Sequence, residues 1–448
     1  MSTTAACRAA IVLLWTLAAV NALSCRGLFW DGASFLANAL ENDTFHDFYP
    51  ARAHVAWLTQ APVLLLARLG LSDTHLLAIV FSTTLIGVPV ALYHLALARV
   101  RERGALLAAV LAIVATVFLP TSFFVIGEYQ VAYAAVTAAV AIALTSGGAG
   151  RRDGGYLLAL GLLTIASYEA MLYLGPLAAL VTLWSARRQR DPAARLLFAV
   201  AAIAFLGGAV VSISTVIDYW NHDYFTRVRS ATWDFWQNLQ FVVALAGLAL
   251  IALVALVFPR WLAGRGPIIA AAIAGVVLVL TPWLRQLVGP DALLFPPAHY
   301  VARSAAGGLL MVLLLAMWAH VAWPQAHWSL MAMLRQPIAA RRLATAMIVL
   351  LVAGAVPDLA LTRLWIDYLV WFRGVVTSRT GLVYADTLPL GDWPYRIFAQ
   401  DWTYPALSVL VRGAPGQAIV VARKTERINP PFDPACGTVP RLDGFAWR

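Results

Sequence analysis

A succession of apolar segments, each about as long as a membrane-spanning helix, constrains the fold of this chain more than any other sequence feature. A helix needs roughly 20 apolar residues to cross a bilayer, and a helix satisfies its own backbone hydrogen bonds there. Qualifying segments recur along most of the chain, at 9–23, 74–98, 105–119, 128–144, 193–217, 241–258, 267–284, 304–322 and 344–361. The sequence therefore predicts an all-α polytopic membrane protein.

Composition excludes a soluble fold. Of the 448 residues, 61% are hydrophobic and only 12% are charged, whereas soluble domains carry roughly a quarter charged residues. The first apolar segment follows Arg8 and resembles a signal peptide. We interpret it as an uncleaved first span, because further apolar segments follow it throughout the chain.

The stretch 156–184 is too long for one span and too short for two of ordinary length. Arginine pairs flank it, at 151–152 and 187–188, so both of its ends are expected on the same side of the membrane. Two short spans meeting at an outer turn, Ser167 to Ala170, satisfy this requirement. They bring the predicted total to about eleven spans.

The basic residues predict the orientation. The net charge of +10 comes almost entirely from arginine, since Lys424 is the one lysine, and the arginines cluster in short loops between apolar segments. Such clusters mark cytoplasmic loops rather than a nucleic-acid surface, so no nucleic-acid partner is expected. The N-terminus is then predicted to be cytoplasmic and the C-terminal tail to lie outside.

Three segments on the outer side are long, namely 24–73, 218–240 and 285–303. We divide the chain into a transmembrane domain, 1–361, and a small extracytoplasmic domain, 362–448. The latter contains the apolar runs LVYADTL, LSVLVR and AIVVAR, which predict short strands. The second domain is therefore expected to contain β structure.

The cysteines have no metal-site spacing. Cys25 and Cys436 are both predicted to lie outside the cytoplasm, where an oxidising compartment would allow a disulfide. The alternative is two unpaired thiols.

The first outer loop is the most informative stretch for function. From Asp31 to Asn42, polar residues recur at helical spacing opposite an apolar face, which predicts an interfacial helix with that apolar face in lipid. A second helix is expected over 53–69, bent at Pro62. Asp31 follows the first span closely, where a carboxylate can meet both a water-soluble acceptor and a lipid-linked donor. The alternative is that Asp31 only caps its helix, since aspartate is a favoured N-cap.

Two glutamates are expected at the same membrane boundary. Glu128 begins the fourth span, and Glu169 lies in the turn between the two short spans. Ionisable groups at this depth are costly unless they face a polar cavity or find a partner. With Asp31 they would form one acidic cluster if the turns converge; the alternative is separate structural hydrogen bonds.

The segment before the tenth span ends in His299, Tyr300 and Arg303. A guanidinium at headgroup depth suits a lipid phosphate, which it binds as a fork. The alternative is an ordinary arginine at a helix end that extends to the membrane surface. Arg52 and His54 of the first loop are weaker candidates for the same role.

Motifs for other chemistry are missing from the sequence. It contains no phosphate-binding loop, dinucleotide-type glycine pattern, HExxH or nucleophile-elbow serine. No cofactor or metal is therefore expected, and a donor substrate must bring its own activation.

This arrangement resembles the C-type (GT-C) superfamily of polytopic glycosyltransferases, which includes protein O-mannosyltransferases, aminoarabinose transferases and oligosaccharyltransferases. The resemblance covers most of the chain. It rests on the first-loop aspartate of FWDGAS (Asp31), the acidic residue of GEYQ (Glu128), the paired short spans and the outer tail. The adjacent Asp-Glu pair of the mannosyltransferases and the WWD of the oligosaccharyltransferases are absent, so no subfamily is indicated.

The resemblance implies a reaction and its partners. Asp31 would be the general base, Glu128 a second acidic group, and the donor a polyprenyl-phosphate-linked sugar whose anomeric carbon is inverted. The acceptor would be an extracytoplasmic glycan, lipid or protein. The implied location is a bacterial inner membrane, with the active site facing the periplasm.

Two other classes remain open on the sequence. A transporter or lipid flippase also places carboxylates at membrane depth, but its site is expected near the middle of the membrane between repeats. The other alternative is a membrane subunit without catalytic activity.

Overall fold

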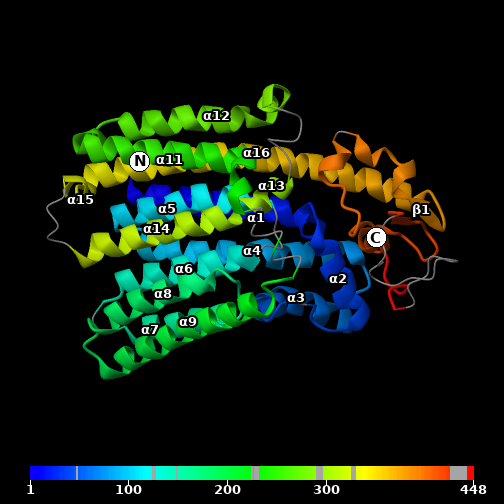
Figure 1. The fold of residues 1–448 in the computed structure, drawn as a ribbon, viewed down its shortest axis with the longest axis horizontal. Coiled ribbons are helices and arrows are strands. Elements are labelled where there is room, and N and C mark those ends of the chain that lie inside the picture. The colour runs from blue at the N-terminus through cyan, green and yellow to red at the C-terminus, as the bar shows by residue number, and fades with distance from the viewer. Residues whose placement is uncertain are drawn as a thin grey trace.

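The computed structural model describes the chain in segments, residues 1–46, 49–123, 128–147, 150–222, 226, 232–288, 296–323, 329–392, 394–423 and 441–448. The fold is a bundle of long helices with a small unit at one end (Figure 1). That unit contains the C-terminal part of the chain and lies beside helix α2 (Asp31–Asn42) (Figure 1).

Within the described residues, nine helices are long and apolar enough to cross a membrane. They are α1 (Thr3–Leu23), α4 (Thr74–Val100), Gly104–Thr121, α6 (Glu128–Thr145), α9 (Pro192–Asp218), α11 (Leu239–Val257), α12 (Gly266–Val288), α14 (Arg303–Ala322) and α16 (Pro337–Thr377). The third of these combines α5 (Gly104–Ile113) with a π turn and a 3-10 turn. Each coincides with a predicted span, so the all-α polytopic architecture is confirmed.

The stretch 156–184 is divided as predicted. Helix α7 (Arg151–Thr164) and helix α8 (Met171–Ala186) are separated by the turn that carries Glu169. Both pack closely on α9: a Cβ on Gly161 of α7 would lie 3.0 Å from the carbonyl oxygen of Ala201, and a Cβ on Gly175 of α8 would lie 2.6 Å from that of Phe205. Small residues at helix contacts allow such close approach in membrane proteins.

Helix α16 continues past the predicted boundary at Leu361 and ends at Thr377. Its distal part buries Trp365, Tyr368 and Phe372, which recur at helical spacing. Trp365 and Tyr368 pack against Phe398 of the tail, and Tyr368 also stacks on Trp365 and Phe372. The transmembrane bundle and the C-terminal unit therefore share one continuous helix.

The C-terminal unit contains less β structure than the sequence predicts. Strand β1 (Leu382–Tyr384) pairs in parallel with β2 (Ile419–Val421), with Val383 opposite Val420. The run LSVLV is instead part of helix α17 (Tyr404–Val411), so the prediction of a strand there is wrong. Periodicity cannot distinguish a short continuous apolar run buried as a strand from one buried as a helix. Pro405 near the helix start favours the helix.

The loop between α1 and α4, predicted to be outside, forms α2 (Asp31–Asn42) and α3 (Ala53–Arg68), close to the predicted bounds. The prediction that the apolar face of α2 lies in lipid is wrong. Phe35 and Leu36 are buried in the protein, where α2 packs against α17 and α3. Trp57 and Leu65 of α3 are exposed instead, so α3 is the helix of this loop with an outward apolar surface.

Short elements connect these helices. They are η1 (Arg26–Leu28), η2 (Pro50–Arg52), η3 (Val114–Phe118), η4 (Leu119–Thr121), η5 (Thr232–Gln237), η6 (Pro259–Ala263), α13 (Pro296–Val301), α15 (Ser329–Leu334), η7 (Ala385–Thr387), η8 (Pro389–Gly391) and η9 (Tyr395–Ile397).

The predicted disulfide between Cys25 and Cys436 falls outside the described residues, because Cys436 does. Cys25 is a buried thiol.

Candidate functional site

Polar side chains from distant parts of the chain converge at the end of the bundle that faces the C-terminal unit. Arg52 of η2 lies at their centre. Its Nε donates to Oε1 of Glu169 over 2.8 Å, and its Nη2 lies 2.7 Å from the same oxygen. Its Nη1 lies 3.5 Å from Oε2 of Glu128. The first loop, the start of α6 and the turn after α7 therefore meet, as the acidic-cluster prediction requires.

The cluster is only partly closed to solvent. The side chain of Arg52 is 10% exposed, and those of Glu128 and Glu169 are 11% and 13% exposed. Aromatic rings surround the guanidinium, whose Cζ lies 5.0 Å from the ring centre of Tyr49 and 5.5 Å from that of Tyr168. A single guanidinium thus faces two carboxylates and is held in place by rings on other sides.

Asp31 is the first residue of α2, and Trp30 occupies the N-cap position with φ 57° and ψ −133°. The Asp31 carboxylate is held from across the molecule, since Nε1 of Trp402 donates to its Oδ1 over 2.9 Å. A positive φ at a bulky residue is strained and persists only when the surrounding structure holds it. The carboxylate is therefore positioned by the tail as well as by its own helix.

Burial raises the pKa of Asp31 above its ordinary value. The hydrogen bond from Trp402 and the charges of Arg52 and Arg303 act in the opposite direction but do not cancel the effect of burial. A carboxylate with a raised pKa is a stronger base, and the two guanidinium groups mark where an anion is stabilised. Asp31 thus lies beside the acidic cluster without being paired to a guanidinium as Glu169 is.

Aromatic rings form one wall next to Asp31. The indole of Trp30 stacks on Tyr300 at a centroid distance of 6.1 Å and meets Trp402 edge-on at 5.6 Å. Tyr300 in turn lies under the Arg303 guanidinium, with Cζ 3.2 Å from the ring centre. Trp402 keeps 42% of its surface exposed. The predicted residues Tyr300 and Arg303 are therefore near Asp31, joined to it through these rings.

His299 and His54 lie in different surroundings. His299 is buried against Phe123, and burial together with the charge of Arg26 lowers its pKa to about 3, so it is neutral. It offers no positive charge to a phosphate. Nδ1 of His54 lies 2.9 Å from the carbonyl oxygen of Leu162, which ties the start of α3 to α7. Neither histidine shares a described contact with Asp31.

A second charged cluster was missed by the sequence analysis. Nη1 of Arg26 lies 3.1 Å from Oδ1 of Asp358, and both side chains have no exposed surface. The same nitrogen donates to Asn21 and to Thr362, and Nη2 donates to the carbonyl oxygen of Ser122. An aspartate within an apolar span is costly without a partner, and that signal at Asp358 could have revealed the cluster.

The role of Trp402 was also missed, and no sequence signal would have shown it. The tryptophan lies 371 residues after Asp31 in the chain. Nothing about its local sequence distinguishes it from other tryptophans of the tail.

The described residues contain no group of three or more His, Cys, Asp or Glu side chains placed to hold a metal ion. The positive charge between Glu128 and Glu169 is supplied by Arg52. The site can accept a proton at Asp31 and can stabilise an anion at Arg303 and Arg52.

Comparisons with known proteins found no family model, no curated protein and no solved structure that matches the chain.

Proposed function

We propose that this protein is a membrane glycosyltransferase of the GT-C type that transfers a sugar from a polyprenyl-phosphate donor to an extracytoplasmic acceptor. The observation that carries the proposal is the position of Asp31. Its carboxylate has a raised pKa, accepts a hydrogen bond from Trp402 and lies within electrostatic reach of Arg52 and Arg303. A base and a phosphate-binding group are the two elements that such a transfer needs.

In the proposed reaction, Asp31 removes the proton of an acceptor hydroxyl as its oxygen attacks the anomeric carbon. The bond between that carbon and the donor phosphate oxygen breaks, and the polyprenyl phosphate leaves with the electron pair. Attack opposite the leaving group inverts the anomeric carbon. Arg303 faces the leaving phosphate, where its guanidinium offsets the charge that develops in the transition state.

The aromatic wall supplies the sugar contact in this proposal. Trp30, Trp402 and Tyr300 present ring faces and edges beside the base. Sugar rings have apolar C–H faces that pack on aromatic rings, while their hydroxyls need polar partners. Glu128 is the proposed second acidic group that orients the acceptor, and Arg52 holds Glu128 and Glu169 in place.

The proposal includes the topology. About eleven spans, counting α7 and α8, place the N-terminus in the cytoplasm and residues 362–448 outside a bacterial inner membrane, because the short loops rich in arginine then lie inside. Single cysteines introduced into the tail of a variant without native cysteines test this orientation. Labelling in intact spheroplasts is expected, and labelling only after permeabilisation would reverse the orientation.

Purified protein and a polyprenyl-phosphate sugar test the reaction. We expect transfer by the wild type and no transfer from the matching nucleotide sugar. Substrate movement across proteoliposomes without bond formation would instead favour the transporter or flippase. The acidic cluster lies at one end of the bundle, since Glu128 begins α6 and Glu169 lies in the turn between α7 and α8, and this location supports the enzyme over that alternative.

A further inference from the structure

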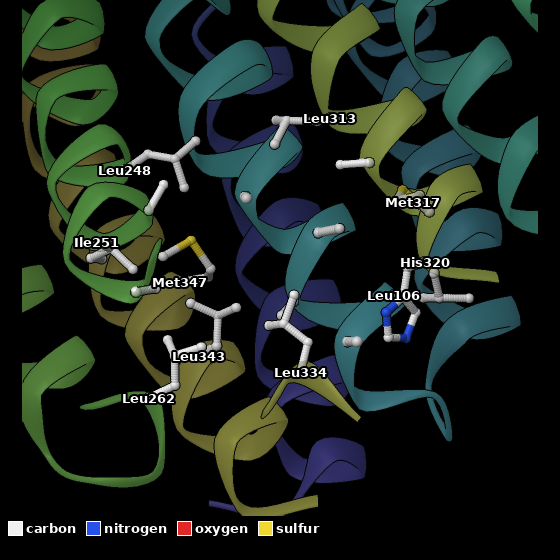
Figure 2. Close-up of a pocket in the computed structure, with 17 residues that line it drawn as sticks. Leu106, Leu248, Ile251, Leu262, Leu313, Met317, His320, Leu334, Leu343 and Met347 are labelled. Carbon is white, nitrogen blue, oxygen red and sulfur yellow. The ribbon is translucent and has the colours of Figure 1, made fainter. Parts of the chain in front are cut away.

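The opposite end of the bundle contains two adjoining cavities of contrasting character. The first, of about 220 Å³, lies between α5, α11, α14 and α16 and is lined almost entirely by aliphatic side chains. Figure 2 shows Leu248, Ile251 and Met347 on one side of it and Met317 on the other. An apolar cavity on the order of 150 Å³ in a protein core stays dry and binds a benzene-sized molecule. This cavity is large enough for part of a hydrocarbon chain.

The second cavity, of about 590 Å³, has a mixed lining that combines apolar side chains with the basic groups of Arg103, Arg335 and Arg341. The two cavities adjoin, because their walls share Ala105, Leu106, His320 and Leu334. Figure 2 shows the ring of His320 beside Leu106, among the otherwise apolar side chains of the first cavity.

The basic cavity has an excess of positive charge. Its one lining carboxylate, Glu102, lies 3.4 Å from Arg101. Among the described residues, Arg335 and Arg341 pair with no carboxylate; they donate to the carbonyl oxygens of Trp323 and Pro337. These bonds hold the guanidinium groups in place without neutralising them, so an anion fits this cavity by charge.

Helix ends add to this charge. The first turns of α1, α5 and α16 all line the basic cavity, through Thr3, Gly104 and Ala340. A Cβ on Gly104 would lie only 2.8 Å from that of Ala340, which shows how closely these turns approach. No side chain described here caps the start of α5 or α16. Uncapped helix N-termini favour an anionic ligand.

We infer that these cavities form a binding site for an anionic phospholipid from the membrane. The phosphate headgroup lies against Arg335 and Arg341, and an acyl chain enters the apolar cavity past Leu334. The site is distinct from the Asp31 site, because the 21-residue helix α1 separates them by about 30 Å. The inference does not depend on sugar transfer.

Native mass spectrometry of delipidated protein, titrated with phosphatidylglycerol and with phosphatidylcholine of the same acyl chains, tests the inference. We expect one phosphatidylglycerol to bind at least about tenfold more tightly than phosphatidylcholine. The double variant Arg335→Gln/Arg341→Gln should abolish that preference. Arg195→Gln is the matched control, since this exposed arginine also donates to one backbone carbonyl but lies outside both cavities.

The chain cavity is tested separately. Ala316→Phe fills part of it and should weaken phosphatidylglycerol binding, whereas Leu315→Phe, at the exposed neighbouring position outside the lining, should not. Equal affinity for the two lipids, or unchanged binding in the double variant, would overturn the inference. So would complete displacement of the lipid by inorganic phosphate at equal concentration, since a headgroup site alone would then suffice. Thermal unfolding in detergent verifies that each variant is folded.

Discussion

Two arginine–carboxylate clusters lie at the same end of the bundle and contain similar residues, but they differ in how far their side chains are buried. Arg26 and Asp358 are completely buried, and Asn21, Thr362 and Ser122 contribute further polar contacts. The Arg52 cluster keeps about a tenth of each side chain exposed and places one guanidinium between two carboxylates. The Arg26 cluster is therefore closed to solvent, whereas the Arg52 cluster is partly exposed to it.

The difference indicates which cluster suits the proposed reaction. A buried ion pair is held by its own partners, and removing one partner leaves an uncompensated charge in the protein interior. The Arg52 cluster has two carboxylates for one guanidinium, a neighbouring Asp31 with raised pKa, and side chains that are each about a tenth exposed. We therefore assign stability to the Arg26 cluster and chemistry to the Asp31 side, and the following variants test that division.

The largest effect on stability is expected from Arg26→Ala. It leaves Asp358 buried without its counter-charge, which typically costs 3–5 kcal/mol in the free energy of unfolding, as an order-of-magnitude estimate. Denaturant unfolding in detergent measures this. The double variant Arg26→Met/Asp358→Leu should recover most of the loss, because a well-packed apolar pair can replace a buried ion pair. A single-variant cost below about 1 kcal/mol would contradict the structural role.

Arg52→Gln should act mainly on transfer. The substitution removes the guanidinium that holds Glu128 and Glu169 and that also lies near Asp31. Hydrogen bonds to charged groups contribute about 1.5–3 kcal/mol, so kcat/KM is expected to fall roughly 10- to 100-fold. Arg52→Lys, which keeps the charge but not the fork, should fall in between. If Arg52→Gln transferred sugar at the wild-type rate, the Arg52 cluster would have no part in the transfer reaction.

Trp402→Phe should change the pH dependence of transfer. The indole hydrogen bond lowers the pKa of Asp31, against the larger effect of burial, so its loss raises that pKa further. Asp31 must be deprotonated to act as a base, and the acidic limb of the kcat/KM profile should therefore move to higher pH. At neutral pH we expect a loss of about tenfold. An unmoved acidic limb would show that the tail does not tune the base.

The smallest effect is expected from Arg363→Gln. Arg363 pairs with Asp367 at 3.1 Å on the surface of α16, with side chains 75% and 47% exposed. Exposed ion pairs of this spacing contribute about 0.5 kcal/mol or less. Unfolding and transfer should both stay close to wild type. A large loss in either measurement would show that the effect of removing an arginine does not depend on how deeply its ion pair is buried.

The helices were predictable because a membrane span leaves a strong local signal. Apolar length located the long helices, and flanking arginines located the break between α7 and α8. The start of α2 at Asp31 followed from polar residues at helical spacing. The sequence could predict an acidic cluster only on the condition that the separate turns meet, because that meeting depends on tertiary packing.

The contacts that distinguish the two clusters were not predictable. The hydrogen bond from Trp402 to Asp31 and the pairing of Arg26 with Asp358 join residues more than 300 positions apart. At that separation, the spacing of residues in the sequence does not predict which side chains meet. The lipid-facing prediction for α2 failed for a related reason. An amphipathic pattern shows that one face is buried, but it cannot tell whether lipid or the tail helix α17 covers that face.

Sugar transfer per folded molecule, measured for Asp31→Asn beside Asp358→Asn, tests the central claim most directly. A positioned base contributes roughly 10²- to 10⁴-fold, so Asp31→Asn should lose at least 10²-fold in kcat. Because burial raises the pKa of Asp31, the ionised carboxylate destabilises the fold above that pKa, and the neutral amide should be at least as stable at pH 7. Asp358→Asn should lose stability, while the molecules that remain folded keep their transfer rate. Wild-type transfer by Asp31→Asn would contradict the account and move the role of base to Glu128.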